Sequence, residues 1–534
     1  MIFGRVKPLD AILATAEKKS LKRSLGAIQL TLFGVGCIIG TGIFVLTSVG
    51  AQKAGPGLIL SFVVAGAVCV VAALCYAEIA SMIPVAGSAY TYSYAVQGEF
   101  LAWTVGWALL LEYAVGASAV SVGWSNYFVN TVMERSWGID VPDWLSAGPQ
   151  ALGGAVGGFI NLPAAVIALL MTGLLLLGTS ESAKFNAILV AIKVTALTAF
   201  VILTLPVMDP ANFEPFAPAG MFGGIGSGVG IVGAAATMFF AYVGFDAVST
   251  AAEETKNPQR NVPIGLIGSL AICTIFYMLV SAGAVGAIGG APIMGPDGVP
   301  YNAGPALSAA CATAQYADAL VCSPEPLAHV LQEIGYGTTG NLIGYAAFIA
   351  LPSVILILLF GQTRIFFVMA RDGLLPEALS KIHPKWQTPH VVTIITGLAV
   401  ATAAAFFPVG ALADIANAGT LYAFAMVAIA VWQLRKTDPN RPRPFRVPAI
   451  GVIASLTVFG CVFLFTNLPL EAILVLPIWT AIGVLIYLAY GRRKSHLGRG
   501  IVEVHEPEIH DIQPTIPGVD EDRASDPNAN RPLT

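Results

Sequence analysis

Four glycines crowd one of the most apolar stretches of the chain. The segment Gly34–Phe44 reads GVGCIIGTGIF, with glycine at its first, third, seventh and ninth positions. Glycine at this density does not sustain a continuous helix. Backbone groups released inside a membrane are tolerated only where they line a cavity. Close helix packing through small residues is the alternative interpretation, but packing alone does not require so many glycines. We therefore predict an interrupted helix here.

A second segment has a related pattern. Several glycines precede Phe239–Asp246, which reads FFAYVGFD and combines an aromatic cluster, a glycine and an acid inside an apolar run. The N–H groups that open a half-helix favour a carboxylate, and the carbonyls that close one favour an ammonium group. Two interruptions that face each other would fit an α-amino acid zwitterion. The predicted backbone donors and acceptors are Thr41, Gly42, Ile38, Phe240, Ala241 and Val243.

Three ionisable residues lie deep in apolar segments, where a charge is costly and indicates function by default. Lys193 is one, and burial disfavours the charged form of a lysine. It is a candidate for proton coupling, with a structural lysine paired to backbone carbonyls as the alternative. Glu112 is a candidate for a proton path or for binding a basic substrate side chain. Asp246 is a candidate for coupling, or for hydrogen bonding within the second interruption.

The composition places these residues in a membrane. Only 11% of the 534 residues are charged and 56% are hydrophobic, whereas soluble domains carry about 25% charged residues. This excludes a soluble enzyme, a disordered scaffold and a nucleic-acid binder. Twelve segments are long and apolar enough to be candidate spans. They are Ala27–Val49, Leu58–Ser81, Trp103–Phe128, Leu162–Gly178, Ala187–Leu205, Gly228–Ala251, Ile264–Ile288, Leu342–Val368, Val391–Phe407, Leu412–Leu434, Val447–Thr466 and Ala472–Tyr490.

The basic residues give the chain an orientation. With the N-terminus inside, all 27 Lys and Arg fall in cytoplasmic segments except Lys53 and Arg135 outside and Lys193 within a span. Cytoplasmic loops are enriched in these residues, so both termini are predicted to be cytoplasmic, with the chain in the cell membrane. The loop 289–339 has no Lys or Arg and is expected outside. Its Cys311 and Cys322 are candidates for a disulfide, with two free thiols as the alternative.

Several long motifs occur in an order that resembles the amino acid–polyamine–organocation superfamily, and the cationic amino acid transporter family in particular. Together they cover roughly residues 25 to 490. They are Gly36–Phe44, Tyr76–Ala80, Pro84–Tyr92, Phe239–Asp246, Glu253–Pro263, Arg371–Pro376, His383–Lys385 and Arg443–Pro448.

The resemblance implies an all-α polytopic fold of the bacterial twelve-span type. Two five-helix inverted repeats, as in LeuT-like transporters, would carry discontinuous helices 1 and 6, and two further helices would follow. The implied parts are an N-terminal segment 1–26, repeats 27–205 and 206–434, helices 11 and 12 in 435–490 and a disordered cytoplasmic tail 491–534.

The resemblance also implies roles for individual residues. By position, the six backbone-binding residues named above bind the amino acid, Phe240 gates the site and Tyr277 faces it. The ammonium of Lys193 stands where sodium-coupled relatives bind a cation.

We therefore predict a secondary active amino acid transporter, not an enzyme, that works by proton-coupled symport and alternating access. Its expected partners are a cationic or neutral amino acid, protons and the lipid bilayer. No cofactor, metal or nucleic acid is expected. An amino acid exchanger or a polyamine carrier is the alternative within transport. A transporter-like sensor or a channel is the alternative from another class.

Overall fold

The computed structural model describes residues 5–8, 25–83, 87–178, 183–250, 255–386 and 388–500. Most of the predicted N-terminal segment and residues 501–534 of the predicted tail lie outside this part. Within it all regular secondary structure is helical, apart from three isolated β-bridges. The predicted all-α class is therefore confirmed for the described residues.

The helices of the first half are α2 (Ala27–Ile38), α3 (Thr41–Phe44), α4 (Leu46–Ala54), α5 (Leu58–Met82), α6 (Ser88–Val96), α7 (Glu99–Tyr127), α8 (Asp143–Ser146), α9 (Leu162–Leu176) and α10 (Ala183–Thr204). Those of the second half are α11 (Gly230–Met238), α12 (Ala247–Thr250), α13 (Pro258–Ile288), α14 (Pro305–Cys311), α15 (Pro326–Glu333), α16 (Gly337–Arg371), α17 (His390–Phe406), α18 (Val409–Thr437), α19 (Ile450–Thr466), α20 (Leu470–Ile486) and α21 (Arg492–Lys494).

Short 3-10 and π segments extend or connect these helices. They are η1 (Gly55–Gly57), η2 (Phe128–Ser136), η3 (Gln150–Leu152), η4 (Leu205–Val207), η5 (Pro210–Phe213), η6 (Phe239–Tyr242), η8 (Leu320–Cys322), η9 (Glu377–Ser380), η10 (Tyr487–Gly491) and η11 (Leu497–Arg499).

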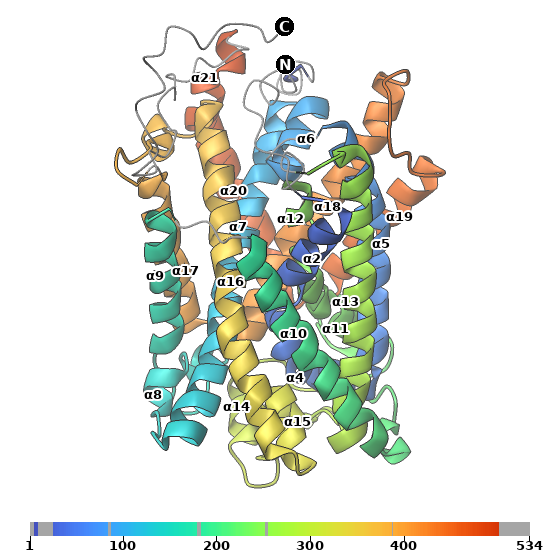
Figure 1. The fold of residues 1–534 in the computed structure, drawn as a ribbon, viewed down its shortest axis with the longest axis vertical. Coiled ribbons are helices and arrows are strands. Elements are labelled where there is room, and N and C mark those ends of the chain that lie inside the picture. Colours follow the sequence, from blue (N-terminus) through green and yellow to red (C-terminus); the bar gives the residue numbers. More distant parts are fainter. Residues whose placement is uncertain are drawn as a thin grey trace, which may run out of the picture.

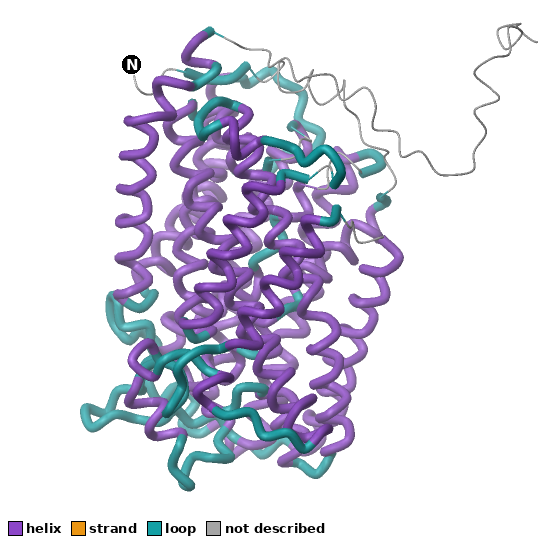
Figure 2. The backbone as a smooth tube through the Cα atoms, turned by 90° about the vertical axis from the view of Figure 1, so that its left-hand side faces the viewer, coloured by secondary structure: helices purple, strands orange, loops and turns teal. Residues whose placement is uncertain are grey.

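The long helices form a bundle. In the described part of the chain, seven helical segments are long and apolar enough to cross a membrane, and five further apolar helices are shorter. The helices run along the long axis, and the connecting loops gather at its two ends (Figure 2). Figure 1 shows α6 and α21 at one end, called here the α21 end, and α8, α14 and α15 at the opposite α15 end.

Ion pairs join distant parts of the sequence at the α21 end. The Lys7 ammonium lies 3.0 Å from the Asp372 carboxylate, and the Arg5 guanidinium lies 3.6 Å from Glu99. The Arg5 side chain also donates to the backbone carbonyl of Arg492. The described residues near the two termini therefore lie at the same end of the bundle.

Both predicted interruptions are observed. The first predicted span divides into α2, which ends at Ile38, α3 and α4, with Ile39 and Gly40 outside the helices. The second divides into α11, the 3-10 turn η6, a turn over residues 243–246 and α12. Each interruption releases backbone N–H and carbonyl groups in the middle of the bundle.

The two interruptions touch each other directly through glycine. A Cβ atom built on Gly42 would lie 2.3 Å from the Cα atom of Ala241, so no side chain fits between the two backbones. Gly244 has a φ of +109°, in the left-handed region, and a Cβ atom there would lie 3.1 Å from the carbonyl oxygen of Cys37. These two glycines allow the broken segments to meet.

We predict that Gly42→Ala destabilises the protein while Gly40→Ala does not. The added methyl group at Gly42 forces the two backbones apart, and overpacking of this kind costs about 1–3 kcal/mol. At Gly40 the nearest atoms to an added Cβ lie 3.6 Å away, which is ordinary contact. Thermal unfolding, followed through the reactivity of the buried thiols Cys37 and Cys273, measures the difference. Equal melting temperatures for the two variants would contradict the prediction.

Candidate functional site

Tyr277 joins the two interruptions. Its hydroxyl lies 2.8 Å from the carbonyl oxygen of Ile38, the last residue of α2, and 2.7 Å from that of Ala241 in η6. A hydroxyl has a single proton and donates to one acceptor at a time. Two helix-end carbonyls therefore converge on one buried point. The structure brings Ile38, Ala241 and Tyr277 together.

Backbone donors lie next to these acceptors. Thr41 and Gly42 open α3, and the first N–H groups of a helix have no partner within it. The Thr41 hydroxyl is buried and has no hydrogen-bond partner in the described part of the chain. Gly123 of α7 packs against it, since a Cβ atom there would lie 2.6 Å from Thr41 Cγ2. This juxtaposition of donors and acceptors suits a group with both a carboxylate and an ammonium.

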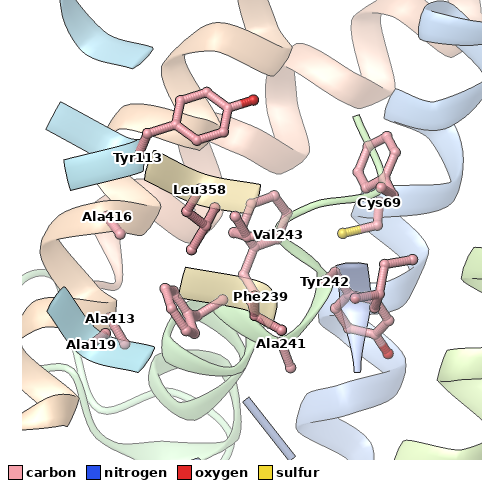
Figure 3. Packing of buried hydrophobic residues seen from close by; sticks show 14 of the residues in the cluster. Cys69, Tyr113, Ala119, Phe239, Ala241, Tyr242, Val243, Leu358, Ala413 and Ala416 are labelled. Atoms are coloured by element: carbon pink, nitrogen blue, oxygen red, sulfur yellow. The ribbon is translucent and has the colours of Figure 1, made fainter. Parts of the chain in front are cut away.

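Apolar side chains surround the second interruption. Phe240 is 5% exposed, and a Cβ atom built on Gly116 of α7 would lie 3.8 Å from its ring and 3.6 Å from Leu358. Val243, the residue that follows η6, belongs to the same buried cluster. Figure 3 shows Val243 near Leu358, with the small side chains of α18 in the same packing layer. The site is thus enclosed by aliphatic and aromatic groups.

Lys193 reaches the first interruption from α10. Its side chain is 1% exposed, and its ammonium donates to the carbonyl oxygen of Gly36 at 2.9 Å. Gly36 lies in the last turn of α2, two residues before Ile38. The ammonium therefore contacts the same half-helix that supplies a carbonyl to the candidate site.

Two buried acids, Glu112 of α7 and Asp246 of the second interruption, lie near each other. Asp246 accepts a hydrogen bond from the Tyr113 hydroxyl at 3.2 Å and lies close enough to Glu112 to interact with it electrostatically. Neither carboxylate oxygen of Glu112 has a hydrogen-bond partner in the described residues. The hydroxyl of nearby Thr420 donates instead to a carbonyl of its own helix. Glu112 therefore lacks the partners that a buried carboxylate normally has.

The two cysteines singled out by sequence are bonded to each other in the structure. Cys311, at the end of α14, and Cys322, in η8, form a disulfide with a Cα–Cα distance of 5.5 Å. The segment η8 packs against α4, the far half of the first interrupted helix. The disulfide therefore lies in a loop that touches the helix leading to the candidate site.

Sequence reasoning missed a buried polar cluster at the α15 end. Lys53 was expected as an external loop charge, but it is 3% exposed and its ammonium lies 2.9 Å from the carboxylate of Asp414 in α18. Thr237 of α11 contacts both side chains. Asp414 lies inside the predicted span Leu412–Leu434, and an acid in an apolar segment is the signal that could have indicated its buried role.

Similar proteins are transporters. The family model described as amino acid permease matches residues 25–488. The branched-chain amino acid permease BcaP of Bacillus subtilis is 44% identical over 93% of this chain and 99% of its own length. The methylthioribose transporter of the same organism is 41% identical over the same shares. The chloroplastic cationic amino acid transporter 9 of Arabidopsis thaliana is 36% identical over 78% of this chain and 68% of its own.

The match covers nearly all of the described helices, including both interruptions and the residues around Tyr277. The predicted resemblance is confirmed at the level of the family, and the relatives are named as permeases and transporters rather than enzymes. This chain therefore belongs to the amino acid permease family of the amino acid–polyamine–organocation superfamily.

Proposed function

We propose that this protein carries neutral, branched-chain amino acids across the cell membrane by symport with protons. One observation carries the proposal: the Tyr277 hydroxyl gathers the carbonyls of Ile38 and Ala241 beside the free amide end of α3. Those groups match the ammonium and carboxylate of an amino acid backbone, and an interrupted helix offers both kinds of group at one place.

The proposed topology has twelve spans with both termini in the cytoplasm. The seven long and five shorter apolar helices support this number. Paired interruptions in α2–α4 and α11–α12 support two inverted repeats over 27–205 and 206–434, followed by helices 11 and 12 in 435–490, because such breaks mark the repeat interface of transporters. The distribution of Lys and Arg supports the orientation, which places the α15 end outside.

The proposed side-chain preference follows from the surroundings of Phe240. The ring of Phe240, Leu358 and Val243 offer apolar contacts without a hydrogen-bonding group, which suits an aliphatic side chain. The similarity to the branched-chain permease of Bacillus subtilis supports the same choice. In this proposal Phe240 also covers the bound amino acid as a gate.

Lys193 is the proposed coupling residue. Its protonated form donates to Gly36, whereas the neutral form has one proton fewer to offer and binds a carbonyl less strongly. Protonation would thus tighten α2 near Ile38 and favour one arrangement of the site. The protonated and neutral forms of Lys193 would favour different arrangements of α2. Alternating access with proton coupling requires two such arrangements whose balance depends on a proton.

Glu112 and Asp246 are proposed as a second proton site, because two carboxylates in an apolar interior are most stable when they share a proton. The unpartnered carboxylate of Glu112 also favours a second candidate function, which is the transport of cationic amino acids. A basic side chain that reached Glu112 would supply the missing partner.

We predict that the purified protein in liposomes concentrates labelled leucine only when an inward proton gradient is present. With one proton for each substrate, a difference of one pH unit supports about tenfold accumulation. Adding an uncoupler should release the accumulated leucine. Uptake that is indifferent to the gradient, with counterflow intact, would contradict symport and indicate an exchanger.

We predict that unlabelled isoleucine and valine compete with leucine at least about tenfold more effectively than arginine does. The reason is that a guanidinium placed among apolar side chains loses its hydration without a full set of partners. Competition by equal concentrations of each compound, including methylthioribose, measures the preference. Stronger competition by arginine would instead support the cationic function and a role for Glu112 in substrate binding.

We predict that Lys193→Met abolishes accumulation but retains leucine exchange. Methionine has a similar length and no proton to carry, so the site is preserved while the driving force is lost. Lys436→Met is the control, because Lys436 is exposed and lies 4.4 Å over the ring of Trp432. A Lys193→Met protein that still accumulates leucine tenfold per pH unit would remove Lys193 from the coupling mechanism.

A further inference from the structure

Three helices meet at a buried ion pair near the α15 end. The Lys53 ammonium of α4 lies 2.9 Å from Asp414 Oδ2 of α18 and 2.5 Å from the hydroxyl oxygen of Thr237 in α11. The Thr237 hydroxyl in turn lies 2.6 Å from Asp414 Oδ1. Each of the three side chains contacts the other two, so the cluster links both interrupted helices to α18.

Because the cluster is buried, pulling its side chains apart without hydrating them costs free energy. Lys53 is 3% exposed, Asp414 is 4% exposed and Thr237 is fully buried. A buried pair gains little net free energy over apolar side chains of the same size, but removing one partner leaves an uncompensated charge. The cluster is therefore stable when it is closed and dry, or when it is separated and hydrated, and unfavourable between these two arrangements.

A second contact, one turn further along α18, also holds α11. The Asn417 amide donates to the carbonyl oxygens of Ala236 at 2.7 Å and Thr237 at 3.0 Å, in the last turn of α11 before it is interrupted. Asp414 and Asn417 are three residues apart, so they lie on one face of α18. This face of α18 fixes the end of α11. Phe239 and the candidate site follow directly in the sequence.

Gln52, the residue before Lys53 in α4, binds the loop that follows α13. Gln52 donates to the carbonyl oxygens of Ile293 at 2.9 Å and Tyr301 at 3.0 Å, and accepts from the Ile293 N–H at 2.8 Å. Gln52 is buried as well. The end of α4 is thus fixed on one side to the loop after α13 and on the other to α11 and α18.

We infer that Lys53, Thr237, Asp414 and Asn417 form a latch that closes the α15 end of the site by holding α4 and α11 against α18. Release of this latch lets the two half-helices move apart and opens the site toward that end. The inference rests on the proposed function, because only alternating access requires the end to open. The four residues are positioning residues, and none of them is assigned a contact with substrate.

Hydrogen–deuterium exchange of the purified full chain tests the latch without any transport measurement. Thr237→Val removes the bridging hydroxyl and keeps the ion pair, and Asp414→Asn removes one charge at nearly constant shape. We expect amide exchange in α4 and α11 to rise about threefold in Thr237→Val, which loses a buried hydrogen bond. We expect it to rise about tenfold in Asp414→Asn, which loses a charge partner. Thr172→Val is the matched control, because buried Thr172 donates only within α9.

A double-mutant cycle separates a latch from general destabilisation. Lys53→Met combined with Asp414→Asn leaves no unpaired charge, so its effect on α4 and α11 should be clearly smaller than the product of the two single effects. Multiplicative effects, or a rise in exchange that is as large in α9 and α19 as in α4 and α11, would overturn the latch. A local, non-multiplicative effect in a protein that moves no amino acid would keep the latch and reject the proposed function.

Discussion

Backbone groups released inside an apolar bundle must find partners, and here carbonyls of both interrupted helices meet the hydroxyl of Tyr277. The absence of a side chain at Gly42 lets α3 lie against the backbone of Ala241. Tyr277 then reaches the carbonyls of both interruptions from α13. The candidate binding groups of Ile38, Thr41, Gly42 and Ala241 lie around this contact.

The buried charges are arranged around the same contact at different depths. Lys193 lies against α2, the half of the first interrupted helix that leads to the α21 end, and Lys53 lies on α4, the half that leads to the α15 end. Glu112 and Asp246 lie beside the second interruption. A buried charge is stable only with its partner in place, so the pairing of Lys193 and of Lys53 depends on the position of the half-helix that each contacts or belongs to. In the proposed mechanism, small movements of the half-helices would change the pairing or protonation of these groups.

Much of this could be predicted because its causes are local in the sequence. The helices follow from long apolar runs. The first interruption follows from the glycine density around Gly40, and the second from a glycine, Gly244, between an aromatic cluster and an acid. The family followed from long motifs in order. The burial of Lys53 could not be predicted in this way. It stands at the end of an apolar run, where a base normally reaches water, and only the position of Asp414 keeps it inside.

The sequence by itself determined that the chain is a helical membrane protein of a known family and where its helices break, and it indicated three of the buried ionisable residues, Lys193, Glu112 and Asp246. These properties depend on the order of residues within one helix. The tertiary structure decided the partners, because they come from distant parts of the chain. Tyr277 and Ile38 are 239 residues apart, and Lys53 and Asp414 are 361 residues apart. Only the packing of α2 against α13 and of α4 against α18 brings such pairs within hydrogen-bond distance.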